Sequence, residues 1–177
     1  AAFAVVNRID DFAYTPEQNI AHAMTALMAQ NKGAGKIDRM KEGFRSGIIL
    51  EIIYGILIFI ICFVFARPLM LMFVKDEEVI GHGVTYLHLI SVMYLLPALT
   101  NGIQGFFRGI GDLKITLISS FINMALRVLA AAPLVFIWKM GIEALPYSYL
   151  AGWIGMLVAE TPLLLKTYKT WGKKAGQ

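Results

Sequence analysis

The sequence is poor in charge and in cysteine. Only 16% of its 177 residues are charged, whereas about 25% is usual for a soluble domain, and 58% are hydrophobic. The hydrophobic residues gather in long runs, which indicates an integral membrane protein and argues against a soluble domain with a large core. The single cysteine, Cys62, lies inside such a run and cannot form an internal disulfide. We therefore interpret it as a small hydrophobic residue.

The sequence also lacks the signatures of several function classes. It contains no G-x-S-x-G, no H-E-x-x-H and no clustered aspartate motif, so nothing favours a membrane-embedded enzyme. His82 and His88 have no Cys or Asp cluster at ligand spacing, so we expect no metal site. The net charge of +4 does not indicate nucleic-acid binding, because the basic residues lie between hydrophobic runs and at the C-terminus.

Five runs are long enough to cross a bilayer as helices. An α-helix rises about 1.5 Å per residue, so roughly 20 residues cover the ~30 Å hydrocarbon core. We predict an all-α integral membrane bundle of about five transmembrane helices and a basic tail. The approximate spans are residues 3–29, 46–66, 84–104, 115–137 and 142–165, and the tail covers 166–177. Pro97 lies near the middle of the third span, where we expect a kink.

The distribution of positive charge predicts the orientation of this bundle. Three segments on one side of the predicted membrane carry eleven of the 16 Lys and Arg residues: a predicted loop over residues 30–45, a predicted turn over residues 105–114 and the tail over residues 166–177. By the positive-inside rule this side is cytoplasmic, which places the C-terminus inside and the N-terminus outside. An outside N-terminus without Met or a signal peptide leads us to expect a fragment that lacks at least one preceding helix.

The first predicted helix is far more polar than the others. Its polar residues recur at spacings of three and four, which places them on one helical face. That face carries Arg8, Asp11, Thr15, Gln18, His22 and Thr25, and is widened by Asp10 and Glu17. The opposite arc, from Val6 through Ile9 and Ala13 to Leu27, is apolar and is expected to tolerate lipid.

Three stretches of the chain resemble the multidrug and toxic compound extrusion (MATE) family. Residues 29–47 read AQNKGAGKIDRMKEGFRSG and resemble the family's Gln-Asn-x-Gly-Ala-Gly turn, which follows the second helix of a six-helix half. Residues 104–117, QGFFRGIGDLKITL, resemble its turn between the fourth and fifth helices. Residues 67–80, RPLMLMFVKDEEVI, resemble its periplasmic stretch between the third and fourth. Their order and spacing agree with part of a C-terminal lobe.

This resemblance implies a fold and a function. It implies a transporter of twelve helices in which two lobes rock to give alternating access, with this chain supplying helices eight to twelve. It also implies export of organic, often cationic, drugs or metabolites in exchange for Na⁺ or H⁺, with no other cofactor. The expected partners are the missing N-terminal lobe and preceding helix, a small organic substrate and membrane lipid. The expected location is a bacterial plasma (inner) membrane.

Four polar residues of the first helix are candidates for cation coupling. A charged group at the bilayer centre costs between ~3 and over 10 kcal/mol, so it normally faces protein or water. Asp10, Asp11 and Glu17 are therefore candidate coupling carboxylates, and His22 is a candidate proton relay. The structural alternatives are an ion pair of Arg8 with Asp11, and a neutral His22 that hydrogen-bonds a neighbouring helix.

Six further residues are candidates for lining a transport cavity. They are Arg8, Gln18, Asn19, Thr25, Arg127 and Glu51. The polar residues of the first helix also serve equally well to hold helices together. Glu51 lies near one end of its span, within reach of water. Arg127 lies about twelve residues from either end of its helix, where an acid on another helix is an expected partner, either as a lock or as a counter-ion.

Two alternative functions remain open from the sequence. A flippase of lipid-linked precursors, or a polysaccharide exporter of the same superfamily, would need a more cationic cavity, and only Arg8 and Arg127 are intramembrane cations. A non-transporting structural subunit would use the polar first helix as a contact between helices.

Overall fold

The structure is a computed structural model, and it describes residues 2–141 and 144–174. Within these ranges the chain forms helices and no strands. The helices are α1 (Ala2–Gly33), α2 (Ile37–Val64), α3 (Ala66–Leu71), α4 (Glu77–Ser91), α5 (Leu95–Gly109), α6 (Leu113–Phe136) and α7 (Ala144–Lys174). The prediction of an all-α fold is confirmed.

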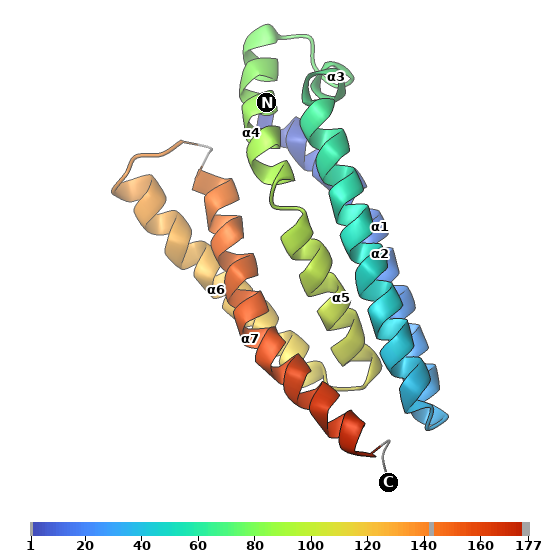
Figure 1. The fold of residues 1–177 in the computed structure, drawn as a ribbon. Coiled ribbons are helices and arrows are strands. Elements are labelled where there is room, and N and C mark those ends of the chain that lie inside the picture. The colour runs from blue at the N-terminus through green and yellow to red at the C-terminus, as the bar shows by residue number, and fades with distance from the viewer. Residues whose placement is uncertain (1, 142–143, 175–177) are drawn as a thin grey trace.

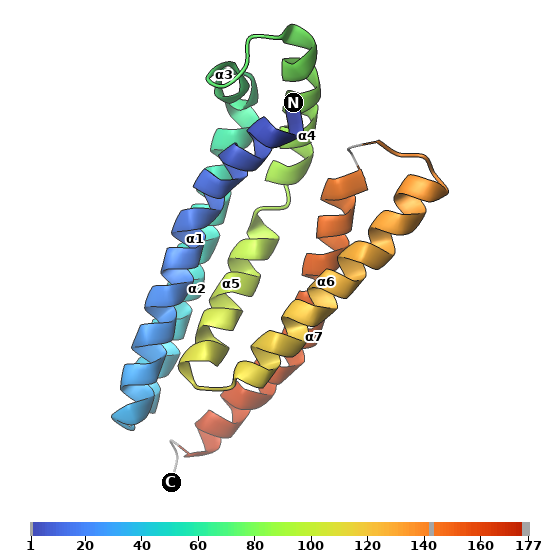
Figure 2. The same cartoon turned by 180° about the vertical axis from the view of Figure 1, so that it is seen from behind.

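The long helices form two antiparallel pairs with α5 between them (Figures 1 and 2). α1 and α2 make one pair, and α6 and α7 make the other. The α1–α2 turn, the α5–α6 turn and the C-terminal end of α7 all lie at the same end of the bundle (Figure 1). The three basic segments of the sequence therefore share one end, although which side of a membrane this end faces stays a prediction.

The α1–α2 connection is much shorter than the predicted loop over residues 30–45. α1 continues to Gly33, the turn uses Gly35 in the left-handed region at φ +69°, and α2 begins at Ile37. The prediction missed that the first residues of α2 have a buried face. Met40 is 2% exposed and Phe44 packs on the same hydrophobic cluster as Phe106, so this basic segment is held in a helix.

The glycines after Gln104 form a helix interface rather than a turn. α5 runs through Gly105 to Gly109, and only the next three residues turn, with Gly111 at φ +81°. A Cβ atom on Gly105 would lie 2.6 Å from the carbonyl oxygen of Ala21, and one on Gly109 would lie 2.6 Å from that of Thr25. The predicted turn over residues 105–114 is thus wrong in its first half, because these glycines let the backbones of α1 and α5 touch.

The third predicted span is a broken helix. α4 and α5 are bent by 48° at a break between Ser91 and Leu95. Pro97 has no N–H and its ring crowds the carbonyl of Met93, which accepts a hydrogen bond from Leu96 instead (2.9 Å). The expected kink is therefore present, and it lies one turn before the proline.

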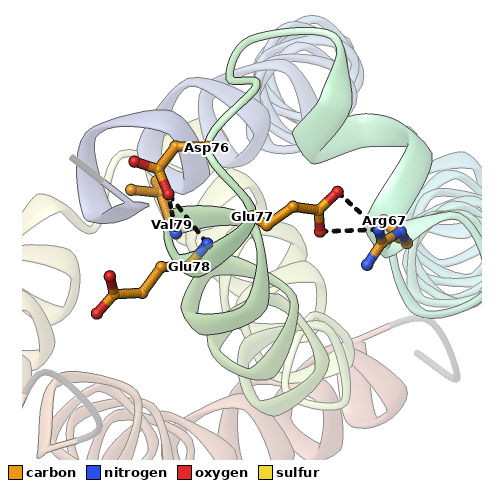
Figure 3. A network of polar contacts seen from close by, with 5 residues as sticks. All are labelled: Arg67, Asp76, Glu77, Glu78 and Val79. Carbon is orange, nitrogen blue, oxygen red and sulfur yellow. Dashed lines mark hydrogen bonds and ion pairs between the residues drawn. The ribbon is translucent and has the colours of Figure 1, made fainter.

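A polar corner fixes the start of α4 against α3 (Figure 3). The Asp76 carboxylate accepts hydrogen bonds from the backbone N–H groups of Glu78 (3.0 Å) and Val79 (3.3 Å), which is an N-cap. The guanidinium of Arg67 donates to both carboxylate oxygens of Glu77, at 2.8 and 3.0 Å. Both contacts are exposed. The first fixes the start of α4, and the second joins α3 to α4.

Three helices are long and apolar enough to cross a membrane, namely α2, α6 and residues Ala144–Thr170 of α7. The bent pair α4–α5 makes a fourth span if it crosses as one. α1 is 32 residues long, but it is too polar to be counted with these, so its crossing stays a prediction. Residues 166–174 of the predicted tail continue α7 as a helix. Residues 142–143 and 175–177 lie outside the described residues.

Candidate transport site

Helix α1 places its acidic residues on two different faces. Asp10 and Glu17 are separated by two helical turns and both face the lobe interior, at 8% and 1% exposure. Asp11 and His22 lie on an exposed face, together with three further candidates, Arg8, Gln18 and Asn19. No ion pair joins Arg8 to Asp11 in the part of the chain that the structure describes.

The first half of the apolar arc of α1 packs inside the lobe. Val6, Ile9 and Ala13 are at most 6% exposed and belong to a cluster that also contains Tyr86 and Tyr94. The expectation that this arc meets lipid is therefore wrong for its first half, whereas Ala23 and Leu27 at its other end are exposed. Hydrophobic periodicity identifies the buried face of a helix only when that face is apolar. Because α1 buries apolar and acidic residues side by side, its sequence pattern does not show which face meets its neighbours.

Asp10 lies where α1 meets the broken span. The hydroxyl of Tyr94, in the last position before α5, donates a hydrogen bond to the Asp10 carboxylate. Tyr14 packs edge-on against Tyr94, with ring centroids 6.0 Å apart. In membrane transporters, interrupted helices with a carboxylate beside them are a recurrent setting for coupling-ion sites.

Glu17 lies about two turns further along α1, between α2 and α5. The side-chain amide of Asn101 hydrogen-bonds its carboxyl group, and Glu51 of α2 is close enough to interact with it electrostatically. Glu51 is fully buried at 0% exposure, so it lies inside the lobe and the prediction that it reaches water is wrong. Neither glutamate has an ion-pair partner, since Arg67–Glu77 is the one ion pair within residues 2–141 and 144–170.

A polar cavity of about 210 Å³ lies between α1, α5, α6 and α7. It is lined by Tyr14, Gln18, Pro97, Thr100, Asn101, Gln104, Ser120, Asn123, Trp153 and Met156. Of the candidates named from the sequence, Gln18 lines this cavity. The others were missed, although polar residues such as Asn123 inside apolar spans are the signal that would have found them.

Gln104 connects this cavity to a third buried carboxyl group. Its amide nitrogen lies 3.4 Å from Ser120 Oγ and 3.4 Å from Glu160 Oε1. Glu160 is 0% exposed, and its second oxygen has no hydrogen-bond partner in the described structure. Sequence reasoning missed Gln104 because it precedes glycines that were interpreted as a turn.

The remaining candidates have other surroundings. The Thr25 hydroxyl lies 2.9 Å from the Ala21 carbonyl and 3.1 Å from that of Gly105, so it fastens α1 to α5 rather than lining a cavity. Asn19 lines a separate groove of about 740 Å³ between α1 and α2. Arg127 pairs with no acid among the described residues. Its guanidinium lies 3.7 Å from the ring centroid of Tyr149, which is a cation–π contact.

Comparison with known proteins identifies the family. The sequence profile of the MatE family matches residues 1–132, so the chain belongs to this family of membrane transporters. It is 30% identical over 181 residues to a Bacillus subtilis protein described as "Probable multidrug resistance protein YoeA", covering 98% of this chain and 37% of that protein. It is 25% identical over 173 residues to a Thermotoga maritima protein described as "Probable multidrug resistance protein NorM", covering 94% of this chain and 36% of that one.

Solved structures agree with this assignment. The fold matches an inward-facing multidrug resistance MATE family transporter with a TM-score of 0.83 at 17% identity, over 97% of this chain and 40% of that one. It also matches the MATE transporter ClbM in complex with Rb⁺, with a TM-score of 0.77 at 17% identity, over 95% and 43%. The chain thus spans little more than a third of the curated relatives that it matches.

Proposed function

We propose that this chain is part of the C-terminal lobe of a cation-coupled exporter of organic, often cationic, compounds. The family and the drug-resistance names of its relatives support export of such compounds. Because those relatives are nearly three times longer, we propose that the chain works together with a second lobe. We propose that the two lobes transport by alternating access and that the protein lies in the plasma membrane of a bacterium. A transport role leaves no need for enzymatic chemistry.

The observation that carries coupling is the pair of buried carboxyl groups on α1. Asp10 and Glu17 are 8% and 1% exposed and have no ion-pair partner in the described ranges. A carboxylate without a counter-charge is costly to keep in a dry interior, so it favours binding H⁺ or Na⁺. A cation that binds in one lobe orientation and leaves in the other couples its gradient to export.

The cavity itself favours drug export over the flippase alternative. Among the residues that the structure describes, no Lys or Arg lines it, and Arg127 lies over the ring of Tyr149. A pyrophosphate group needs fixed positive charge at its binding site. Amide and aromatic side chains instead suit an uncharged or cationic organic compound.

The test is gradient-driven efflux from proteoliposomes. The chain is reconstituted together with a first lobe, with a fluorescent organic cation inside, and either a proton or a Na⁺ gradient is imposed. We expect one gradient to accelerate efflux, and Asp10→Asn and Glu17→Gln together to abolish that acceleration. Efflux that ignores both gradients would end the coupling proposal.

A further inference from the structure

The exposed face of α7 changes from apolar to cationic along the helix. Four exposed apolar residues follow one another at spacings of three and four, so they share one stripe of the helix. They are Ile154, Val158, Pro162 and Leu165. Lys169 continues this stripe, and the exposed Lys166 lies beside it. The stripe therefore runs from the middle of a candidate membrane span to two ammonium groups near its end.

Tyr168 fixes the direction in which this stripe faces. Its hydroxyl donates a hydrogen bond to the backbone carbonyl of Lys41 at 3.1 Å, and its ring centroid lies 5.7 Å from that of Phe44. Tyr168 thus faces α2 and the lobe interior. Because one residue turns a helix by about 100°, Lys166 points roughly 200° away from Tyr168 and faces out of the lobe.

A groove of about 440 Å³ lies along the end of the stripe. It is lined by Pro162, Leu165, Lys166, Lys169 and Thr170. The Thr170 hydroxyl is already bonded to backbone carbonyls of its own helix, at 2.7 and 3.1 Å, which leaves the two lysines as donors to a ligand. The groove therefore has an apolar part toward the middle of the span and a cationic part away from it.

The two ammonium groups have no acidic partner. Neither lysine forms an ion pair within residues 2–141 and 144–170, and no Asp or Glu follows Glu160 in the sequence. Glu160 itself is fully buried and accepts a hydrogen bond from Gln104, so it faces the lobe interior. Two cations without counter-charges beside an exposed apolar stripe are complementary to an anionic amphiphile.

We propose that this groove binds the headgroup of an anionic phospholipid. The phosphate oxygens accept hydrogen bonds from Lys166 and Lys169, which are neighbours on the helix because they are three residues apart. An acyl chain lies along Leu165 and Pro162, toward the middle of the span. A zwitterionic lipid carries the same phosphate, but its own ammonium group cancels the charge that the lysines attract, so the groove prefers a lipid with net negative charge.

This inference goes beyond the proposed function, because it requires only that α7 lies in a membrane. The end of α7 and the α1–α2 turn share one end of the bundle (Figure 1), so the lipid belongs to the leaflet at that basic end. The lysine stems extend along the apolar groove while their ammonium groups reach the headgroup layer. A lipid held in this way fixes the depth of α7 in the bilayer.

The experiment is native mass spectrometry of the full chain, delipidated in detergent and titrated with phosphatidylglycerol or with phosphatidylcholine of the same acyl chains. We expect the first phosphatidylglycerol to bind roughly tenfold more tightly than the first phosphatidylcholine. The double variant Lys166→Gln, Lys169→Gln is expected to lose this preference, whereas Lys166→Arg, Lys169→Arg keeps the charge and is expected to keep it. The matched control is Lys36→Gln, Lys114→Gln, which removes two exposed lysines outside the groove and is expected to leave the preference unchanged.

Four outcomes would overturn the proposal. Equal affinity for the two lipids would mean that the groove does not select negative charge, and an equal loss in the control variant would mean diffuse attraction to basic residues. Displacement of the bound lipid by millimolar inorganic phosphate would mean a site for free phosphate. A dimer that is lost in Lys166→Gln, Lys169→Gln while lipid binding stays the same would mean a contact between copies of the chain. Circular dichroism checks folding, which we expect to be kept because both lysines are exposed.

Discussion

Two faces of α1 carry acids that are neighbours in sequence and unlike in surroundings. Asp10 is 8% exposed and accepts a hydrogen bond from Tyr94, whereas Asp11 is exposed. One residue turns a helix by about 100°, which here moves a carboxyl group from the lobe interior to its surface. The difference teaches that the neighbours of a helix, rather than its own polarity, select which acid is buried.

The contact that buries the inner face gives the largest expected effect. Gly105→Ala places a Cβ atom 2.6 Å from the Ala21 carbonyl, so α1 and α5 must separate. We expect a loss of about 3 kcal/mol in the free energy of unfolding in detergent. The control is Gly81→Ala, where nothing lies within 4 Å of the new atom and a gain of about 0.5–1 kcal/mol is expected. Equal effects at both positions would contradict the backbone contact.

The next effect tests the two faces directly. Asp10→Asn removes the buried acid and is expected to reduce the rate of gradient-driven efflux at least tenfold. A tenfold loss corresponds to about 1.4 kcal/mol in activation free energy. Asp11→Asn removes an exposed acid and is expected to change efflux less than twofold, because water already solvates that carboxylate. The measurement is the initial rate in proteoliposomes at matched protein density. A larger loss in Asp11→Asn would reverse the assignment of the faces.

A smaller effect is expected in the α6–α7 hairpin. Tyr149→Leu removes the ring beneath the Arg127 guanidinium and the edge contact with Trp153, so we expect a loss of about 1–2 kcal/mol in thermal stability measurements. Tyr149→Phe keeps the ring and is expected to stay within about 0.5 kcal/mol of the unsubstituted chain. If Tyr149→Phe loses as much stability as Tyr149→Leu, the hydroxyl that both variants lack, rather than the ring, holds Arg127.

The smallest effect is expected at the exposed corner of Figure 3. Glu77→Gln breaks the ion pair with Arg67, whose side chains are 69% and 59% exposed, and is expected to cost about 0.5 kcal/mol at low salt. Glu78→Gln is the control, because the backbone N–H of Glu78 makes the bond to Asp76. High salt should remove the difference between the two variants. A difference that persists in molar salt would argue against a simple surface pair.

The least buried of the apolar spans was the easiest to predict. α6 spans Leu113–Phe136, against a predicted 115–137, because it is one uninterrupted apolar run whose length alone defines it. α5 was harder, because a glycine permits both a turn and a close helix contact, and only the position of α1 decides between them. The start of α2 was missed for a related reason. Its many basic residues indicated a loop, although Met40 and Phe44 between them form a buried helical face.

The candidate site could be predicted only in part. That α1 carries candidate coupling acids was predicted from their position in an expected membrane helix, but the division between a buried Asp10 and an exposed Asp11 depends on which helices pack against α1. The contact of Gln104 with Glu160 joins residues 56 positions apart, and the hydrogen bond from Tyr94 to Asp10 joins residues 84 positions apart. Such pairings arise from the fold, and no local pattern in the sequence encodes them.

The backbone contact between α1 and α5 has a mechanical consequence. Where two helices touch through Gly105 and Gly109, no layer of flexible side chains is left between them to shear. The two helices are then expected to move together as a rigid body. The carboxyl groups of α1 keep a fixed distance from α5 when this pair tilts. Motion of this kind is collective and belongs to the microsecond-to-millisecond range. Movement of α1 would therefore open the α1–α2 seam, where side chains such as Met24 and Leu27 can yield, while the contact with α5 stays rigid.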